Sequence, residues 1–533
     1  MAPAVAAPMA ETAILRAVAP GSVGLAPQIT APPPLDLFHD LRWISVFHNS
    51  WVALALELLG VIALRSVWMA WVVHHAWPEG EPAPAMRPAA RRASFFYALS
   101  TLLFVPWVVL LFGLAFSHLS FLFFAAIPPA LAIAAIVHRG AASRAAGARL
   151  GWRPTWRSLA WILGSFVWLT ISGAVVTTAS APVALAAAAA AGLLNARAAY
   201  GVVQDIALRH TRRPLPALVP ALVTTVFVVT VGGSALGFAL TAGHQHAGHR
   251  HAGVLPAAAP GEHPVLIAAG LHSRYDPRSP LRLPRGYVAW RFSYRGLGSR
   301  GRPLSYGPAA TQQSLLVSAH RMARQVEALH RAYGEPVTVV AESEGALVAR
   351  TYLLDLYPPA THAVDRLITL DMPSGSSAVY FPPRGRQGWG VGSGWGLRGL
   401  ARLLGAIAPL RLSVDSSLGR EFIDCRALLA RLAVTPQPAG VQEVSFQALA
   451  DMVDPPAEAP PGIQTYLVGA PHGGMMERRS VQDLIQGILS GGSSAQNDRG
   501  PGFVARLVAA TARPWESPSL PLALDPSGSC VGG

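Results

Sequence analysis

The sequence predicts an α-helical membrane bundle followed by an α/β domain with a mostly parallel sheet. Two observations predict this architecture. Long stretches without a charged residue are confined to the first half of the 533 residues, and the second half alternates strand-like with helix-like patterns from His263 onward. Such alternation is typical of a parallel sheet covered by helices on both faces. The hydrophobic fraction of 52% therefore averages two different kinds of domain.

In the first half, apolar stretches are long enough to cross a bilayer, which takes about 20 residues. The uncharged run from Ser158 to Ala196 is too long for one crossing, so we place a break at 177–182. Glu57 falls inside the first span. We interpret it as facing the bundle or an interface, with an intramembrane functional acid as the alternative. The six predicted spans are 44–64, 94–117, 119–137, 158–178, 182–202 and 216–242.

Arginine in the short loops predicts the orientation of these spans. The loops after the first, third and fifth spans carry arginine, whereas the two loops between them carry no positive charge. Because positive loops stay in the cytoplasm, the second half is expected outside, with the protein a multi-pass component of the cell membrane. That compartment permits a disulfide between Cys425 and Cys530, although free thiols fit the sequence equally well.

The N-terminal segment and the linker between the two halves contain no residues that indicate a catalytic or metal site. Residues 1–43 form a Pro/Ala-rich tail before the membrane region 44–243, and 244–261 form a His-rich linker. The linker histidines lack a carboxylate or cysteine to complete a metal site, so neither a metal nor another cofactor is expected. The formal charge of +14 comes from arginines that are scattered or lie beside apolar spans. A nucleic-acid partner is therefore not expected, because it would require clustered basic residues with interleaved aromatics.

The most informative motif of the second half surrounds Ser343. Residues 337–342 read as a β-branched strand, and a helical pattern begins directly after the serine. A sharp turn from strand to helix projects the serine hydroxyl from the sheet, and the N–H of Glu344 then faces a developing oxyanion. Gly345 supplies the second small residue of the Gly-x-Ser-x-Gly pattern, and Ala341 replaces the first glycine. The motif predicts a nucleophile elbow.

Further motifs follow in an order that resembles the α/β-hydrolase superfamily, and more narrowly bacterial triacylglycerol lipases and esterases. The similarity lies in 287–299, a strand leading into Arg-Gly-x-Gly-Ser, in the elbow and helix at 337–354, and in the strand and turn at 364–377. It covers about residues 262–490 and none of the membrane half. The resemblance implies an α/β-hydrolase domain over 262–490. Residues 491–533 are interpreted as a linker and tail, from the Gly/Ser/Asn composition that follows Ser490.

The resemblance also implies a catalytic triad in the chain order Ser, acid, His. Ser343 would be the nucleophile, His472 the general base and Asp451 the residue that fixes the imidazole tautomer. Asp454 and Asp371 are the alternative acids. Each residue also has an ordinary structural interpretation. Ser343 could be a helix N-cap, Asp451 and Asp454 turn residues, and His472 a loop histidine. What favours the triad is that all of its members follow predicted strands.

Two groups near Ser343 complete the predicted site. The strand beginning at His263 ends in a turn at 270–273, and the resemblance implies that the N–H groups of Leu271 and Glu344 form the oxyanion hole. Glu342 and Glu344 flank the nucleophile, where a carboxylate facing the reaction would raise the barrier. We expect Glu344 to lie in the first turn of the helix, where the helix dipole favours a negative charge.

An insertion of about residues 376–443 interrupts the predicted domain. It contains an amphipathic run from Leu397, with apolar residues at helical spacing. We interpret it as a lid over an acyl pocket or on the membrane surface, or as a structural cap.

The predicted function is that of a membrane-anchored serine hydrolase that cleaves carboxylic esters, with a lipid-like ester as substrate. The alternatives are an extracytoplasmic acyltransferase on the same fold and a non-catalytic membrane sensor or scaffold. Substrate chain length and oligomeric state do not follow from the sequence.

Overall fold

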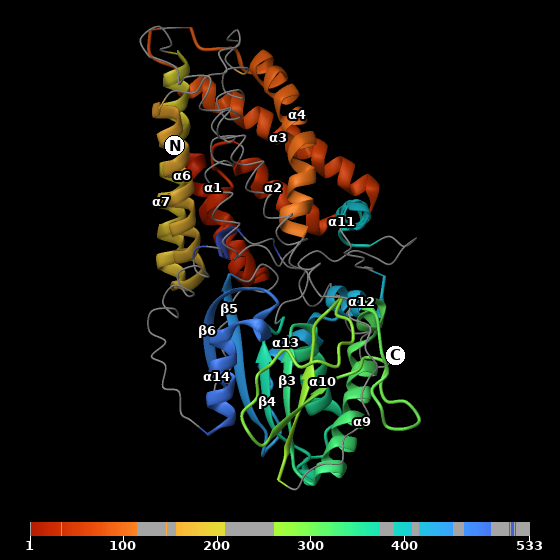
Figure 1. The fold of residues 1–533 in the computed structure, drawn as a ribbon. Helices are drawn as coiled ribbons and strands as arrows, with labels where there is room; N and C mark the ends of the chain where they lie inside the picture. The colour runs from red at the N-terminus through yellow and green to blue at the C-terminus, as the bar shows by residue number, and fades with distance from the viewer. Residues whose placement is uncertain are drawn as a thin grey trace. The chain divides into compact units, whose positions relative to one another are not determined.

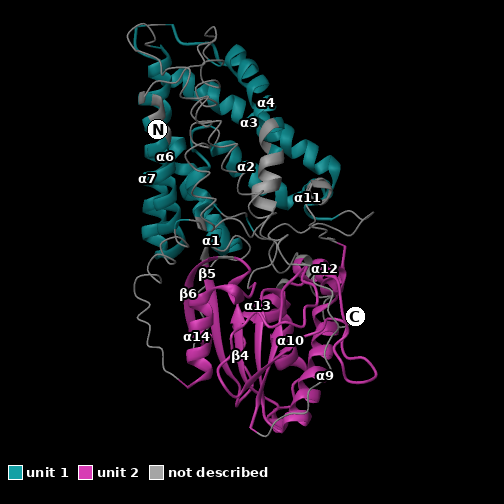
Figure 2. Cartoon of the chain, viewed as in Figure 1, with its two compact units in different colours: residues 1–237, 377–402, 510–524 teal, residues 238–376, 403–509, 525–533 magenta. Residues whose placement is uncertain are grey.

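The computed structural model divides the chain into two compact units (Figure 2). Unit 1 contains residues 1–237, 377–402 and 510–524, and unit 2 contains 238–376, 403–509 and 525–533. The residues described are 2–33, 35–80, 82–113, 145, 156–207, 261–373, 388–407, 415–450, 463–491, 511, 513–515 and 518. Residues 244–260 of the His-rich linker and the predicted spans 119–137 and 216–242 lie outside these ranges.

Unit 1 is built from helices. Neighbouring pairs are α1 with α7, α3 with α4, and α6 with α7. The uncharged run of the sequence breaks between α6 and α7, inside the predicted segment 177–182. The helices are α1 (Ala2–Val18), the 3-10 helix η1 (Pro20–Gln28), α2 (Leu35–Phe47), α3 (Trp51–His75), α4 (Met86–Gly113), α6 (Trp156–Thr178) and α7 (Ala181–Ala207) (Figure 1).

Two helices of the described residues, α3 and α7, are long and apolar enough to cross a membrane. A shorter apolar stretch covers Leu163–Thr178. The predicted number of about six is therefore not reached in the described part of the chain. The bounds of the first span, 44–64, are wrong because the chain breaks before α3. Ser50 Oγ accepts a hydrogen bond from Ala53 N–H at 3.1 Å, which caps the start of α3, and the helix ends at His75.

Residues 1–43 form α1, η1 and most of α2, so the prediction of an N-terminal tail is wrong. A buried polar network joins these elements to α3. The guanidinium of Arg65 donates to both carboxylate oxygens of Asp40 at 2.6 Å, and His39 Nε2 lies 2.9 Å from Glu11 Oε1. Charges that would be costly to bury alone are thereby paired. Burial raises the pKa of Asp40, but the charges and hydrogen bonds of Arg65 and His39 together outweigh burial and lower this pKa to about 2.

Two segments from the second half of the sequence belong to unit 1. The first contains the start of α11 (Val391–Ile407), where Gly392 N–H donates to His48 Nε2 at 2.7 Å and Ser393 Oγ donates to Ser45 O at 2.7 Å. The second contains Trp515, whose ring stacks on Phe166 with centroids 4.7 Å apart. The predicted helix near Leu397 is therefore present. The insertion 376–443, however, is divided between the units instead of forming one cap.

The core of unit 2 is a six-stranded parallel sheet of order β2-β1-β3-β4-β5-β6. A parallel sheet agrees with the predicted α/β class. Because all strands run the same way, their carboxyl ends meet at one edge. The strands are β1 (His263–Ala268), β2 (Tyr287–Arg291), β3 (Val337–Glu342), β4 (Val364–Leu370), β5 (Gln442–Ala450) and β6 (Gln464–Pro471).

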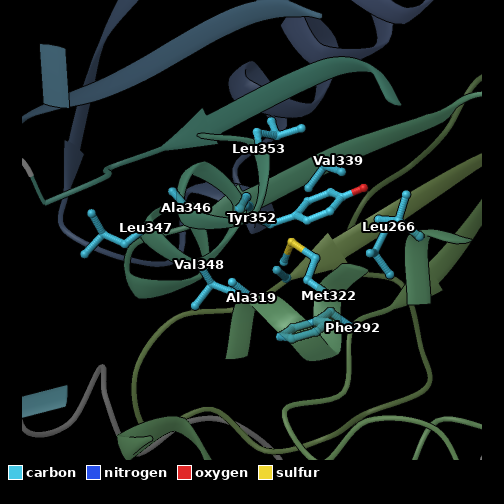
Figure 3. Packing of buried hydrophobic residues seen from close by; sticks show 14 of the residues in the cluster. Leu266, Phe292, Ala319, Met322, Val339, Ala346, Leu347, Val348, Tyr352 and Leu353 are labelled. Atoms are coloured by element: carbon cyan, nitrogen blue, oxygen red, sulfur yellow. The ribbon is translucent and has the colours of Figure 1, made fainter. Parts of the chain in front are cut away.

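Helices cover both faces of this sheet. On one face α9 (Leu315–Tyr333), α10 (Glu344–Thr351), α12 (Ser417–Asp424) and α13 (Arg426–Val434) contribute to a core that includes Val339 and Met322 (Figure 3). On the other face α14 (Arg479–Leu489) packs Ile485 into a cluster with Val340 and Phe446. The central strand β3 is therefore buried on both sides, as its run of apolar residues predicts.

Two further links tie the peripheral helices of unit 2 to its core. Arg350 of α10 is fully buried, and its Nη1 lies 2.5 Å from each carboxylate oxygen of Glu443 on β5. The same guanidinium donates to Thr435 O, beyond α13. Cys425, between α12 and α13, is held in a disulfide. Cys530, the other cysteine of the sequence, lies outside the described residues.

Candidate active site

Ser343 lies at the sharp junction between β3 and α10. Its backbone has φ 54° and ψ −124°, a conformation that residues with a side chain rarely adopt. Two hydrogen bonds hold it there: Ser343 N–H donates to Leu370 O at 2.8 Å, and Ala346 N–H donates to Ser343 O at 3.0 Å. The junction therefore has the geometry predicted for a nucleophile elbow.

Glycine is required at two positions around this junction. A Cβ on Gly345 would come within 2.9 Å of Ala269 O, and a Cβ on Gly270 would come within 2.7 Å of Ser343 Cβ. The turn after β1 thus passes directly beside the serine at Gly270. Ala341 is fully buried within β3, where a methyl group is accommodated in place of the glycine of the pattern.

His472 is distant from Ser343 in the sequence but lies next to it in the structure. His472 follows β6, three strands away from β3 in the sheet. Its Nε2 lies 2.8 Å from Ser343 Oγ, which is the distance of a direct hydrogen bond. This contact joins residues that are 129 positions apart in the sequence.

Of the three candidate acids, only Asp371 lies in the described part of the chain, since 451–462 are outside it. Asp371 follows β4, is buried, and has a positive φ of 47°. Its Oδ1 accepts from Ala448 N–H at 2.7 Å, and its Oδ2 accepts from Gly473 N–H at 3.3 Å. Asp371 is therefore bonded to the residue that follows His472.

From the sequence, Glu342 was expected to raise the reaction barrier if its carboxylate faced the site. In the structure this carboxylate accepts a hydrogen bond instead. Its Oε1 accepts from Met475 N–H at 2.8 Å, in the segment that follows His472. Burial raises the pKa of Glu342, and the Met475 amide and the charges of His472 and Arg291 offset only part of this rise. One feature of the sequence could have indicated a structural role for Glu342. It is the last residue of the strand that also positions the nucleophile.

Glu344 lies in the first turn of α10, as expected, and is buried with 2% of its surface exposed. Burial raises the pKa of Glu344 well above its usual value, and Tyr294 offsets this only in part. The side chain therefore stays neutral over a wider pH range than a free glutamate does. A neutral carboxyl group does not repel a developing oxyanion, so the expected conflict at this position is removed.

We expect Glu344→Gln to stabilise the protein at high pH more than at low pH. Below about pH 4.5 the carboxyl group is protonated in both states. Above it, the unfolded chain ionises while the folded chain does not, so the wild type loses up to about 1.4 kcal/mol per pH unit until the raised folded pKa is passed. Glutamine avoids this loss. Denaturant unfolding of the solubilised protein at pH 4 and pH 8 measures the difference, and an equal effect at both pH values contradicts it.

No protein-family model matches the chain, and no curated protein matches it significantly. Among solved structures, TT1662 from Thermus thermophilus is 15% identical, with 45% of this chain and 92% of that chain covered and a TM-score of 0.24. The mature lipase BlEst2 from Bacillus licheniformis is 16% identical, covering 37% and 69%, with a TM-score of 0.21. A bacterial membrane phospholipase A is 15% identical, covering 52% and 97%, with a TM-score of 0.26. Because all three TM-scores are below 0.5, the function proposed below depends on the geometry of this chain alone.

Proposed function

We propose that the chain is a membrane-anchored serine hydrolase that cleaves carboxylic esters through an acyl-enzyme. The observation that carries this proposal is the 2.8 Å contact between Ser343 Oγ and His472 Nε2 at a strained elbow. A hydroxyl group is a weak nucleophile unless an adjacent base accepts its proton. The imidazole of His472 is placed to be that base.

The reaction would proceed in two halves. His472 accepts the proton of Ser343 while the Oγ attacks the ester carbonyl, and the N–H groups of Leu271 and Glu344 stabilise the oxyanion. His472 then returns the proton to the departing alcohol, which leaves an acyl group on Ser343. A water molecule activated by the same imidazole releases the acid. Asp451 is proposed as the residue that orients His472.

Asp454 and Asp371 remain the alternatives to Asp451 as the triad acid. Asn variants of the three aspartates, compared for kcat, would separate the triad acid from the other two. Loss of the acid costs a serine hydrolase about 10⁴-fold in kcat.

The surface of α3 supports insertion in a membrane. Leu56, Leu59 and Leu64 are exposed by 64%, 62% and 65%, and such a concentration of exposed apolar side chains on a helix of spanning length fits contact with lipid. We propose a multi-pass anchor with unit 2 outside the cell, on the distribution of arginine among the loops. An enzyme anchored in this way would act on lipid-like esters.

The described parts of the insertion favour fixed structural segments over a movable lid. Leu418 of α12 and Leu429 of α13 are buried in the core of unit 2, and Glu421 Oε2 accepts from Leu315 N–H at 2.8 Å. Residues 388–402 are bonded within unit 1 as described above. Opening a segment that is anchored in this manner would require a large free energy, because buried contacts and hydrogen bonds would have to break.

Two other functions would use the same fold. In an acyltransferase an alcohol replaces water in the second half-reaction, and analysis of the products with added acceptor alcohols would identify it. A non-catalytic sensor or scaffold would have no need for a strained serine in contact with a histidine, so the elbow geometry favours the enzyme.

Labelling of intact cells with a membrane-impermeant fluorophosphonate tests chemistry and sidedness together. We expect labelling of the wild type and of Ser490→Ala, an exposed serine at the end of α14, and none of Ser343→Ala. Labelling only after permeabilisation would support the enzyme and contradict the proposed orientation. An unlabelled wild type in lysed cells would contradict the hydrolase.

A further inference from the structure

Two carboxylates from neighbouring strand ends hold the loop that carries His472. Asp371, after β4, accepts a hydrogen bond from Gly473 N–H at 3.3 Å. Glu342, the last residue of β3, accepts one from Met475 N–H at 2.8 Å. The segment that follows the histidine is therefore tied by its backbone to the two central strands of the sheet.

This loop needs such ties because of its composition. Gly473 and Gly474 have φ values of 77° and 69°, and no atom within 4 Å would obstruct a Cβ at either position. The glycines are thus required by the backbone conformation and not by crowding. Glycine has the largest conformational freedom to lose on ordering, so contacts elsewhere must fix the path of the chain between the imidazole and Met475.

We infer that Glu342 is a positioning residue for His472: its carboxylate anchors the loop through Met475 N–H, and its negative charge favours the imidazolium formed when His472 accepts the serine proton. The inference rests on the proposed function, since it assigns a role within that reaction. Glu342 and Ser343 are consecutive residues, so one strand end positions both the nucleophile and the loop of its base. Electrostatic attraction between Glu342 and His472 also contributes to the pKa of the glutamate.

The charge and the hydrogen bond can be separated by substitution. Glu342→Gln keeps an oxygen that can accept from Met475 N–H but removes the charge, and Glu342→Ala removes both. Asp483→Asn is the control, because Asp483 is an exposed carboxylate on α14. Turnover of a soluble short-chain ester by the full-length protein in detergent gives kcat and KM, and the rate of fluorophosphonate labelling reports on Ser343 directly.

We expect Glu342→Ala to lower kcat by about 10- to 100-fold with KM nearly unchanged, because a small misplacement of a catalytic group has an effect of this size. Glu342→Gln should recover most of kcat. Its kcat/KM profile should extend to lower pH, because the imidazolium is no longer favoured by a neighbouring charge. Asp483→Asn should leave kcat within about two-fold of wild type, since an exposed charge interacts weakly through solvent.

The outcomes distinguish this inference from the proposed function. Ser343-dependent turnover with an unchanged kcat in Glu342→Ala overturns the inference and leaves the hydrolase in place. A wild type without Ser343-dependent turnover overturns both. A purely structural role predicts that kcat falls only in proportion to the loss of folded protein and that the pH profile of Glu342→Gln equals that of wild type. If Glu342→Ala does not fold, that pH profile alone decides.

Discussion

Replacement of Ser343 by Ala is expected to lower kcat for ester hydrolysis by about 10⁴- to 10⁶-fold, since the variant lacks the atom that becomes acylated. His472→Ala should cost a similar factor. The double variant should be no worse than either single one, because the two side chains act as one unit. Steady-state hydrolysis of a soluble ester by the purified full-length protein measures all three.

Ser490→Ala is the control for these variants, since it removes an exposed serine at the opposite end of the sheet and should retain wild-type turnover. Thermal unfolding checks that the site variants remain folded. If Ser343→Ala retained turnover within about ten-fold of wild type, the serine mechanism would be excluded. Additive losses in the double variant would show that Ser343 and His472 act independently.

Replacement of Arg350 by Met is expected to destabilise unit 2 by about 3–5 kcal/mol, because it leaves Glu443 buried without its charge partner. Both side chains are largely excluded from solvent, at 0% and 4% exposure. Arg350 also donates to Thr435 O, so the same substitution leaves a carbonyl group without this donor. Denaturant unfolding monitored by tryptophan fluorescence gives the change in the free energy of unfolding.

The double variant Arg350→Met with Glu443→Leu separates the ion pair from the packing. Removing both charges should recover much of the loss, since an apolar pair of similar volume avoids the desolvation cost. A matched control is Arg431→Met, which breaks the exposed pair with Asp355 at 2.7 Å and should cost less than about 1 kcal/mol. Equal losses for Arg350→Met and Arg431→Met would contradict the importance of burial.

Local patterns were sufficient to predict the elbow and the parallel sheet. The β-branched run before Ser343 and the helical run after it determine both elements with little help from the rest of the chain. The contact with His472 was predicted from the resemblance in motif order and from the position of both residues after strands, because parallel strands bring their carboxyl ends to one edge. The role of the acid residue stays a prediction, since Asp451 and Asp454 lie outside the described residues.

The errors arise from hydrogen bonds and ion pairs that hydropathy and composition do not reveal. Residues 1–43 were predicted as a tail because of their proline and alanine, yet the pairing of Arg65 with Asp40 and of His39 with Glu11 orders them. The start of α3 was misplaced because a capping serine inside an apolar run has no hydropathy signal. Glu342 was misjudged because its partner, Met475 N–H, is a backbone group that no sequence pattern identifies.

The assignment of residues 377–402 and 510–524 to unit 1 has a consequence for dissecting the molecule. A single cut in the linker at 244–261 would leave both segments on the C-terminal fragment, without the His48 and Phe166 partners that they have in the intact chain. The two halves therefore cannot be expected to behave as separable modules. Co-expression of both fragments, or excision of the two segments together, is the design that keeps these contacts in view.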